Sequence, residues 1–207
     1  MTTEKYDAQA ERWTEQAYAD SEAYLSHRAE LVLALGPPLR PGDRVLDLAC
    51  GDGGLAEALL TRGLSYLGVD ASEAMVEAAQ GRLGPRADVV QGDLNDYAPP
   101  EPVPATTCFR AVYYARDRLA FFRHVAGYTE RKLVFDLNPR QFRLDDVLAD
   151  LRGAGFEHTA LRPFFVPQTV ALPRPAAAAL RAAERSGPLA RAALRFRFTY
   201  LVAAWRS

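Results

Sequence analysis

The chain alternates short apolar runs of strand length with longer segments whose apolar residues recur at helical spacing. Glycine, proline and aspartate lie at the junctions, where strands and helices usually end. The apolar runs predict seven strands, at residues 44–49, 64–70, 87–93, 104–109, 131–137, 156–166 and 194–205. Strands separated by helix-length segments form parallel βαβ units, so the pattern predicts an α/β fold with a doubly wound sheet.

Helical spacing is clearest between these strands and near both ends of the chain. Residues 4–35 predict two helices that end at Gly36. The segment rich in alanine and arginine, residues 174–194, predicts a helix interrupted at Gly187. Between the strands we expect helices with Ser72 as one N-cap, over residues 54–62, 72–83, 117–128 and 144–155.

Acidic residues and glycines end three strands of the predicted sheet. The stretch VLDLACGDGGLAEALL, residues 45–60, runs from a strand through a glycine-rich turn into a helix and contains Asp47 and Asp52. Asp70 ends the second strand and Asp93 ends the third. Because ligands bind at the carboxyl ends of parallel strands, these residues predict a binding site at one edge of the sheet.

Two kinds of nucleotide-like ligand fit this edge. Gly51, Gly53 and Ala56 match the glycine fingerprint of dinucleotide-binding proteins, and Asp70 follows at the distance expected of a ribose-binding acid. However, a pyrophosphate would face the two aspartates of the turn, and no lysine or arginine between residues 45 and 61 neutralises them. An NAD-dependent oxidoreductase is therefore the less favoured alternative.

A ligand with an adenosine and a cationic end removes this conflict. S-adenosylmethionine has ribose hydroxyls for Asp70 and an adenine amine within reach of Asp93. Its ammonium and sulfonium groups are attracted by carboxylates, so an acidic turn favours its binding.

The stretches VLDLACGDGGLAEALL, YLGVDASEAMVEAAQ and VVQGDL resemble the first three motifs of class I S-adenosylmethionine-dependent methyltransferases. The first is the most specific, because it matches the family's Asp/Glu-x-x-x-Gly-x-Gly-Gly pattern at Asp47, Gly51, Gly53 and Gly54. The resemblance implies a Rossmann-like sheet of seven strands, parallel with an antiparallel last strand and flanked by helices. It also implies methyl transfer to a small-molecule acceptor that is held in line with the sulfonium methyl.

The resemblance covers residues 40–140, the expected cofactor-binding core. Backbone groups of the glycine-rich turn would contact the methionyl part of the cofactor. Ala71 and Met75 would flank the adenine as apolar walls. Asp93 would accept a hydrogen bond from the adenine amine, and the Leu94 N–H would donate one to the ring. The cofactor-binding residues expected in this sequence are Arg28, Asp47, Ala49, Cys50, Gly51, Gly53, Asp70, Ala71, Met75, Asp93 and Leu94.

The remaining segments complete one expected domain, residues 1–207. Residues 1–36 would form a helical lid over the cofactor, as such a segment often does in this family. Residues 141–207 would form the C-terminal half of the sheet. The lid segment contains four large aromatic residues, Tyr6, Trp13, Tyr18 and Tyr24.

The sequence departs from the family at the fourth strand, where an acid commonly begins the strand and Pro104 lies instead. Any role of that acid must be lost or moved. A cofactor-binding protein without transferase activity is therefore a second alternative to the methyltransferase.

The acceptor side of the site is expected after the fourth strand, at Phe109, Arg110, Tyr113 and Tyr114. Arg110, with Arg140 and Arg143, favours an anionic acceptor, because a guanidinium binds carboxylate or phosphate as a planar fork. The candidate catalytic residues are His27, Arg110 and Tyr113. His27 is the favoured base, since the N-terminal segment is expected to approach the cofactor.

Composition argues against several other functions. The 207 residues carry a formal net charge of −1, which gives no bias toward nucleic acid or anionic membranes. Cys50 and Cys108 form neither a disulfide framework nor a metal-ligand spacing. The polar N-terminus is unlike a signal peptide, and no apolar run approaches the ~20 residues of a spanning helix. We therefore expect a cytoplasmic monomer or homodimer that binds neither nucleic acid nor membrane.

Overall fold

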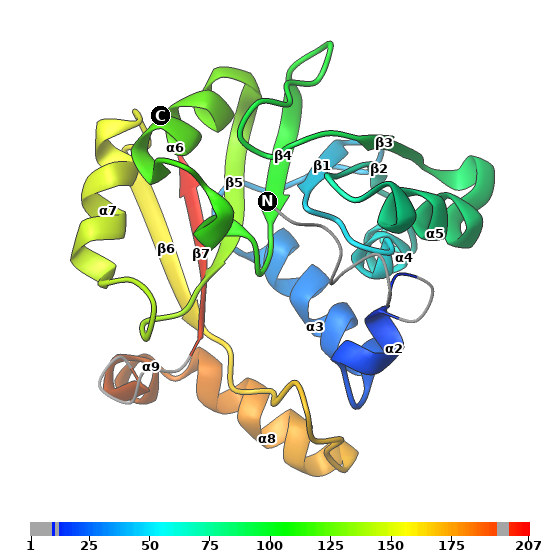
Figure 1. The fold of residues 1–207 in the computed structure, drawn as a ribbon. Coiled ribbons are helices and arrows are strands. Elements are labelled where there is room, and N and C mark those ends of the chain that lie inside the picture. Colours follow the sequence, from blue (N-terminus) through cyan, green and yellow to red (C-terminus); the bar gives the residue numbers. More distant parts are fainter. Residues whose placement is uncertain (1–9, 11–12, 194–198) are drawn as a thin grey trace.

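The computed structural model describes residues 10, 13–193 and 199–207, and a seven-stranded sheet forms its centre (Figure 1). The strands are β1 (Arg44–Leu48), β2 (Ser65–Asp70), β3 (Asp88–Gln91), β4 (Val103–Cys108), β5 (Thr129–Leu137), β6 (His158–Pro163) and β7 (Tyr200–Trp205). They lie in the order β3-β2-β1-β4-β5-β7-β6. β7 is antiparallel to β5 and β6, whereas the other pairs are parallel. This topology confirms the expected Rossmann-like sheet, and its order reverses between β1 and β4, where a ligand is expected to bind.

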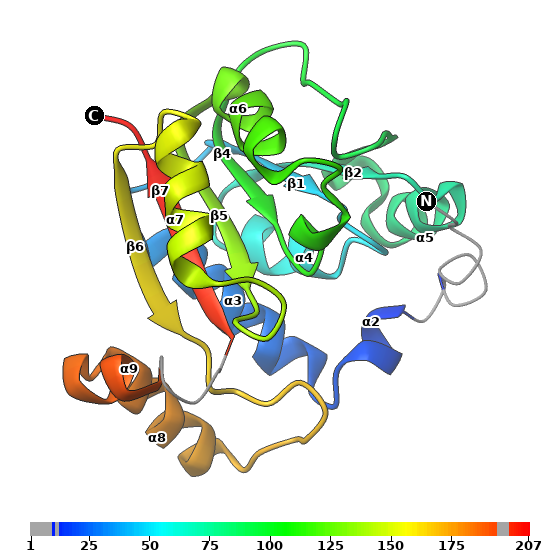
Figure 2. The same cartoon turned by 60° about the vertical axis from the view of Figure 1, so that its left-hand side comes forward.

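Helices cover both faces of the sheet (Figures 1 and 2). The helices are α2 (Trp13–Ala17), α3 (Ser21–Ala34), α4 (Gly54–Leu60), α5 (Glu73–Leu83), α6 (Arg118–Tyr128), α7 (Leu144–Gly153), α8 (Arg174–Arg185) and α9 (Gly187–Ala193), with 3-10 turns η2 (Gly84–Arg86) and η3 (Val112–Tyr114). Buried side chains of α3, α4 and α5 pack on one face. Those of α6 and α7 pack on the other.

Alternation along the strands explains the two apolar layers. Val45 and Val134 belong to the layer beneath α3, α4 and α5. Their neighbours Leu46 and Phe135 belong to the layer beneath α6 and α7. Side chains point to opposite faces at successive positions, so a continuous apolar run fills both layers at once.

The predicted elements differ from the structure mainly at their ends. The expected helical segment 4–35 contains α2 and α3, while residues 1–9 and 11–12, including Tyr6, lie outside the described residues. The strand expected at residues 156–166 is present but shorter, as β6. Residues 194–198, the first part of the last predicted strand, also lie outside the described residues. Ser72 is the N-cap of α5, as predicted, since its hydroxyl accepts a 3.2 Å hydrogen bond from Met75 N.

The connection from β6 to β7 reaches the N-terminal helices. It contains α8 and α9, which lie beyond the end of the sheet, with α8 beside α3 (Figure 2). Ala19 N donates to Gln168 O at 2.9 Å, and Gln168 Nε2 donates to Ala17 O at 2.8 Å. Two segments far apart in sequence therefore meet over the carboxyl ends of the strands. Within the described ranges, no helix has the length and apolar character needed to span a membrane.

Candidate cofactor pocket

A cavity of about 420 Å³ opens where β1 and β2 end and where the chain leaves β4. Its volume is that of a site for a small ligand. The structure brings to its wall most of the residues proposed from the sequence: Arg28, Asp47, Ala49, Cys50, Gly51, Asp70, Ala71, Met75, Asp93, Leu94, Arg110 and Tyr113. Of the other two, Gly53 shapes the adjoining turn, and His27 lies elsewhere.

The turn after β1 has a backbone that favours glycine. Gly51 and Gly53 have φ values of 58° and 73°, in the left-handed region. Gly51 N donates a 2.8 Å hydrogen bond to Asp70 Oδ2, which joins the ends of β1 and β2. Asp70 Oδ1 accepts a second bond from Ser72 N at 3.0 Å, so the carboxylate has a fixed orientation at the pocket wall.

Asp47 is a buried carboxylate beneath this turn. It accepts hydrogen bonds from Tyr66 Oη at 2.8 Å and from Thr107 Oγ1 at 2.6 Å. Burial raises the pKa of Asp47 to about 6, although the two hydroxyls and the charge of Arg28 act in the opposite direction. A cationic group arriving in the pocket would favour the ionised form.

Asp52 is paired with an arginine, which the sequence analysis did not expect. Its buried carboxylate accepts a 3.0 Å bond from Thr14 N and another from the Thr14 hydroxyl, and it pairs with Arg82 at 2.8 Å. The charge of Asp52 is therefore compensated by an arginine outside residues 45–61. Asp52 thus joins α2 to the turn, and of the two aspartates of the turn Asp47 alone can still attract a cationic ligand.

Asp93 lies at a more exposed part of the pocket wall than Asp47. Burial acts to raise the pKa of Asp93, but bonds from Asn95 N and Nδ2, at 2.8 and 2.7 Å, and the charge of Arg116 lower it overall. The nearest oxygen of Asp93 is 3.3 Å from Arg116 Nη2. The carboxylate is therefore kept ionised and able to accept a hydrogen bond from a ligand.

Arg28 contributes a buried guanidinium to the pocket wall. Nη2 donates to Tyr24 Oη at 3.2 Å and lies 3.6 Å from Asp136 Oδ2, while Nε is buried without a hydrogen-bond partner among the described residues. Burial acts to lower the pKa of Arg28, but Tyr24, Tyr18 and Asp136 outweigh it, so the group stays cationic. An anionic oxygen from a ligand would complete its hydrogen bonding.

Aromatic side chains line the outer part of the pocket. Trp13 and Tyr18 come from α2 and the turn after it, and Phe109, Tyr113 and Tyr114 follow β4. Gly54 allows α2 to approach, because a Cβ at this position would overlap the Thr14 hydroxyl. The N-terminal segment thus contributes directly to the pocket wall.

His27 is not among the residues that line the pocket. Its Nε2 lies 2.6 Å from Glu184 Oε2, and its Nδ1 lies 3.4 Å from Glu30 Oε2. The ring stacks on Phe164 at 5.1 Å between centres and is almost fully buried. Both nitrogens already face carboxylates, so this geometry does not support the predicted role of His27 as a base and gives the residue a structural place instead.

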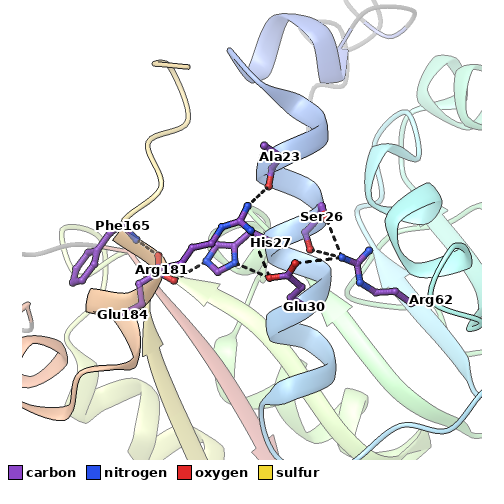
Figure 3. Close-up of polar contacts among 8 residues, drawn as sticks. All are labelled: Ala23, Ser26, His27, Glu30, Arg62, Phe165, Arg181 and Glu184. Atoms are coloured by element: carbon purple, nitrogen blue, oxygen red, sulfur yellow. Dashed lines mark hydrogen bonds and ion pairs between the residues drawn. The ribbon is translucent and has the colours of Figure 1, made fainter. Parts of the chain in front are cut away.

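The carboxylates around His27 connect three parts of the chain. Glu30 is also 3.6 Å from Arg62 Nη2, after α4, and 3.8 Å from Arg181 Nη1 on α8. Glu184 accepts a 2.7 Å bond from Phe165 N. The network therefore ties α3 to α8 and to the end of α4 (Figure 3).

Arg140 and Arg143 are absent from the wall of this cavity, so Arg110 is the one member of that predicted trio that lines it. Sequence reasoning missed three residues that organise the pocket, namely Thr14, Arg82 and Arg116. Each contacts a partner more than twenty positions away, and no local pattern marks such a pair. In the described part of the chain, no three His, Cys, Asp or Glu side chains gather to hold a metal ion.

Comparison with known proteins agrees with this geometry. Residues 45–131 match the family model described as "Methyltransferase domain". Residues 45–131 of this chain therefore form a methyltransferase domain. The family and the cofactor predicted from the sequence motifs are thereby confirmed.

Individual relatives cover only part of the chain. An uncharacterized methyltransferase of Geobacillus thermodenitrificans is 30% identical over 118 residues, 55% of this chain and 51% of its own length. The trans-aconitate 2-methyltransferase of Rhizobium rhizogenes is 37% identical over 95 residues, 44% of this chain and 36% of its own. The chain thus spans about half or less of these curated relatives.

The fold is shared over the full length with solved structures. The TehB-like SAM-dependent methyltransferase of Corynebacterium glutamicum has a TM-score of 0.70 and 15% identity, with both chains fully covered. At this identity the likeness concerns the fold.

Proposed function

We propose that this protein transfers a methyl group from S-adenosylmethionine to a small-molecule acceptor. The observation that supports this most is the pocket at the ends of β1 and β2, with the glycine-rich turn held against Asp70. The trans-aconitate 2-methyltransferase that matches part of the chain acts, by its name, on a small molecule. A small acceptor also suits a cavity of about 420 Å³.

The cofactor would lie along the edge of the sheet. Asp70 would bind the ribose hydroxyls, and Ala71 and Met75 would flank the adenine. Asp93 and the Leu94 N–H would bind the polar edge of the adenine. All five of these residues line the cavity.

The methionyl end would lie over the turn. Backbone groups from Ala49 to Gly53 would contact it, and Asp47 would attract its ammonium through its charge. Arg28 would bind its carboxylate through the Nε that has no partner in the described structure. The two charges of the amino-acid end thus each have an opposite charge on the pocket wall.

The cofactor supplies an electrophilic methyl carbon on a sulfonium. The protein's contribution is to hold an acceptor atom in line with that carbon and to exclude water. We propose that Trp13 and Tyr18 provide this exclusion as part of an N-terminal lid. The cavity wall in the described ranges includes no histidine or lysine, so an acceptor atom that is already unprotonated suits this pocket.

Calorimetry with S-adenosylhomocysteine tests the cofactor site. We expect micromolar binding that Asp70→Ala weakens at least tenfold, since the substitution removes a charged hydrogen-bond acceptor, roughly 1.5 kcal/mol or more. Asp88→Ala is the control, because this carboxylate is exposed on β3 and pairs with Arg44 away from the cavity. Binding of NADH in place of S-adenosylhomocysteine would contradict the proposal. Transfer of labelled methyl from S-adenosylmethionine into small molecules of a cell extract then tests the reaction.

A further inference from the structure

The backbone of Arg110 has a conformation that is uncommon for residues other than glycine. Its φ is 56°, in the left-handed region, and in the described ranges Ala49 is the other non-glycine residue with positive φ. The Arg110 N–H donates a 2.6 Å hydrogen bond to Asp136 Oδ1, which holds this conformation. Such conformations cost free energy and persist where the surroundings enforce them, often at binding sites.

The Arg110 side chain lies at the aromatic part of the pocket. Its Cζ is 5.4 Å from the ring centre of Trp13 and 5.9 Å from that of Tyr18. Nη1 is buried and has no hydrogen-bond partner in the described structure. Cation–π contact offsets only part of the cost of removing a guanidinium from water, so an anionic oxygen from a ligand is needed to complete the site.

The cofactor can satisfy only one of the two incomplete guanidinium groups. S-adenosylmethionine has a single carboxylate, and Arg28 is the better partner for it because the charge of Arg28 acts directly on Asp47 beneath the turn. Arg110 lies against Trp13 and Tyr18, whereas the rings next to Arg28 are those of Tyr24, Phe109 and Phe164. Its anion must therefore come from the second ligand, the acceptor.

A carboxylate fits this position better than a phosphate. Asp47, Asp70 and Asp93 line the same cavity and disfavour a dianion, and no lysine lines it in the described ranges. A single guanidinium fork matches the two oxygens of one carboxylate. The rings of Trp13 and Tyr18 next to it suit a planar apolar body.

We propose that Arg110 binds the carboxylate of the methyl acceptor, and that the acceptor is a small acid with a planar apolar part. This rests on the proposed methyltransferase function. In the reaction, a lone pair of the acceptor forms a bond to the methyl carbon as the carbon–sulfur bond breaks. The bonding electrons remain on sulfur, which leaves S-adenosylhomocysteine and the methylated acid. Any proton on the attacking atom passes to solvent.

The test measures binding of small acids to the protein saturated with S-adenosylhomocysteine. The probes are trans-cinnamate, benzoate, 4-hydroxybenzoate and fumarate, each beside its amide, and inorganic phosphate. We expect at least one acid to bind and its amide to bind at least tenfold more weakly. Arg110→Gln should remove the preference for the acid and leave S-adenosylhomocysteine affinity within about twofold, a difference of roughly 0.4 kcal/mol.

Arg140→Gln is the matched control, because Arg140 is exposed and absent from the cavity wall. It should bind the acid as the wild type does. Four results would each overturn the assignment of Arg110. The acid and its amide could bind equally well, or none of the acids could bind. Inorganic phosphate could be the only anion that binds, or Arg110→Gln could leave the affinity for the acid unchanged. Failure of the wild type to bind S-adenosylhomocysteine would instead overturn the methyltransferase proposal.

Discussion

Thr14 is bound to Asp52 through both its backbone and its side chain, and this pair joins α2 to the glycine-rich turn across 38 positions of sequence. Asp52 in turn pairs with Arg82 on α5, so the contact is charged and buried. α2 also places Trp13 over Gly51, where the Trp13 ring lies 3.3 Å from the position that a Cβ would occupy. The position of α2 and the shape of the candidate cofactor pocket are therefore coupled.

Thr14→Val removes one hydrogen bond of this contact and preserves the shape of the side chain. We expect S-adenosylhomocysteine to bind roughly tenfold more weakly, because a hydrogen bond to a charged group contributes about 1.5 kcal/mol or more. Calorimetry measures the effect. Thr61→Val is the control, since its hydroxyl bonds to Ala58 O at the exposed end of α4. Equal affinity of Thr14→Val and wild type would show that α2 does not act as a lid for the cofactor.

We expect cofactor binding to depend on pH through Asp47. Its pKa is about 6 in the ligand-free protein, so the carboxylate is mostly neutral at pH 5 and mostly charged at pH 7. A bound ammonium favours the charged form, and we expect affinity for S-adenosylmethionine to rise between these values. In Asp47→Asn the rise should be largely absent. Calorimetry at pH 5, 6 and 7 on both proteins checks this, and parallel profiles would contradict it.

The same carboxylate should lower the stability of the ligand-free protein. Its folded pKa lies above the ordinary 3.8, so the folded state holds a proton that the unfolded chain loses between pH 4 and 6. The stabilising contribution of Asp47 is therefore lost as pH rises through that window. Relative to wild type, Asp47→Asn should gain unfolding free energy from pH 4 to pH 6.5, as measured by urea denaturation. A constant difference across the range would refute this origin.

The buried pair His27–Glu184 should stabilise the folded protein. Glu184→Ala leaves His27 without its 2.6 Å partner and Phe165 N without its acceptor, so we expect a loss of about 3 kcal/mol of unfolding free energy. Arg185→Ala, at the next and exposed position of α8, should change it by less than about 0.5 kcal/mol. Urea denaturation measures both. If His27→Gln lowered turnover while stability stayed unchanged, the residue would be the base that the sequence predicted.

The parts of the fold that local patterns encode were predictable. The strand ending in Asp70 and the N-cap at Ser72 follow from alternation and from a short hydroxyl side chain before a helix. The glycine-rich turn and the acids at the strand ends predict a binding site at one edge of the sheet, and a cavity lies there because parallel strands bring their carboxyl ends together.

Long-range pairs were not predictable in this way. Spacing along the chain could not show that Glu184 would bury beside His27, 157 positions earlier, and a lone histidine near a pocket-forming helix looks like a base. Nor could it show that Arg82 compensates Asp52. Arg110 was identified from its residue type and its place after β4, whereas its strained backbone and its bond to Asp136 required the structure.

Lys132 provides a stability test away from the pocket. It is fully buried on β5 and its Nζ donates to Leu35 O at 2.7 Å and to Leu33 O at 3.3 Å, which satisfies carbonyls at the end of α3. Burial, with a smaller effect from Arg131, lowers the pKa of Lys132 from 10.5 to about 8. Between these values the unfolded chain keeps a proton that the folded protein has released. The contribution of Lys132 to unfolding free energy therefore rises with pH across this window.

The wild type should consequently gain stability relative to Lys132→Met as pH rises from about 8 to 10, because the variant has no such group to titrate. The variant should also be less stable at every pH, since the two carbonyls lose their buried donor. Urea denaturation of both proteins at a series of pH values measures the difference. A difference in unfolding free energy that stayed constant or decreased with rising pH would contradict this prediction. It would mean that burial does not disfavour the Lys132 ammonium, and that the carbonyls at the end of α3 are bound by a charged group at no cost in stability.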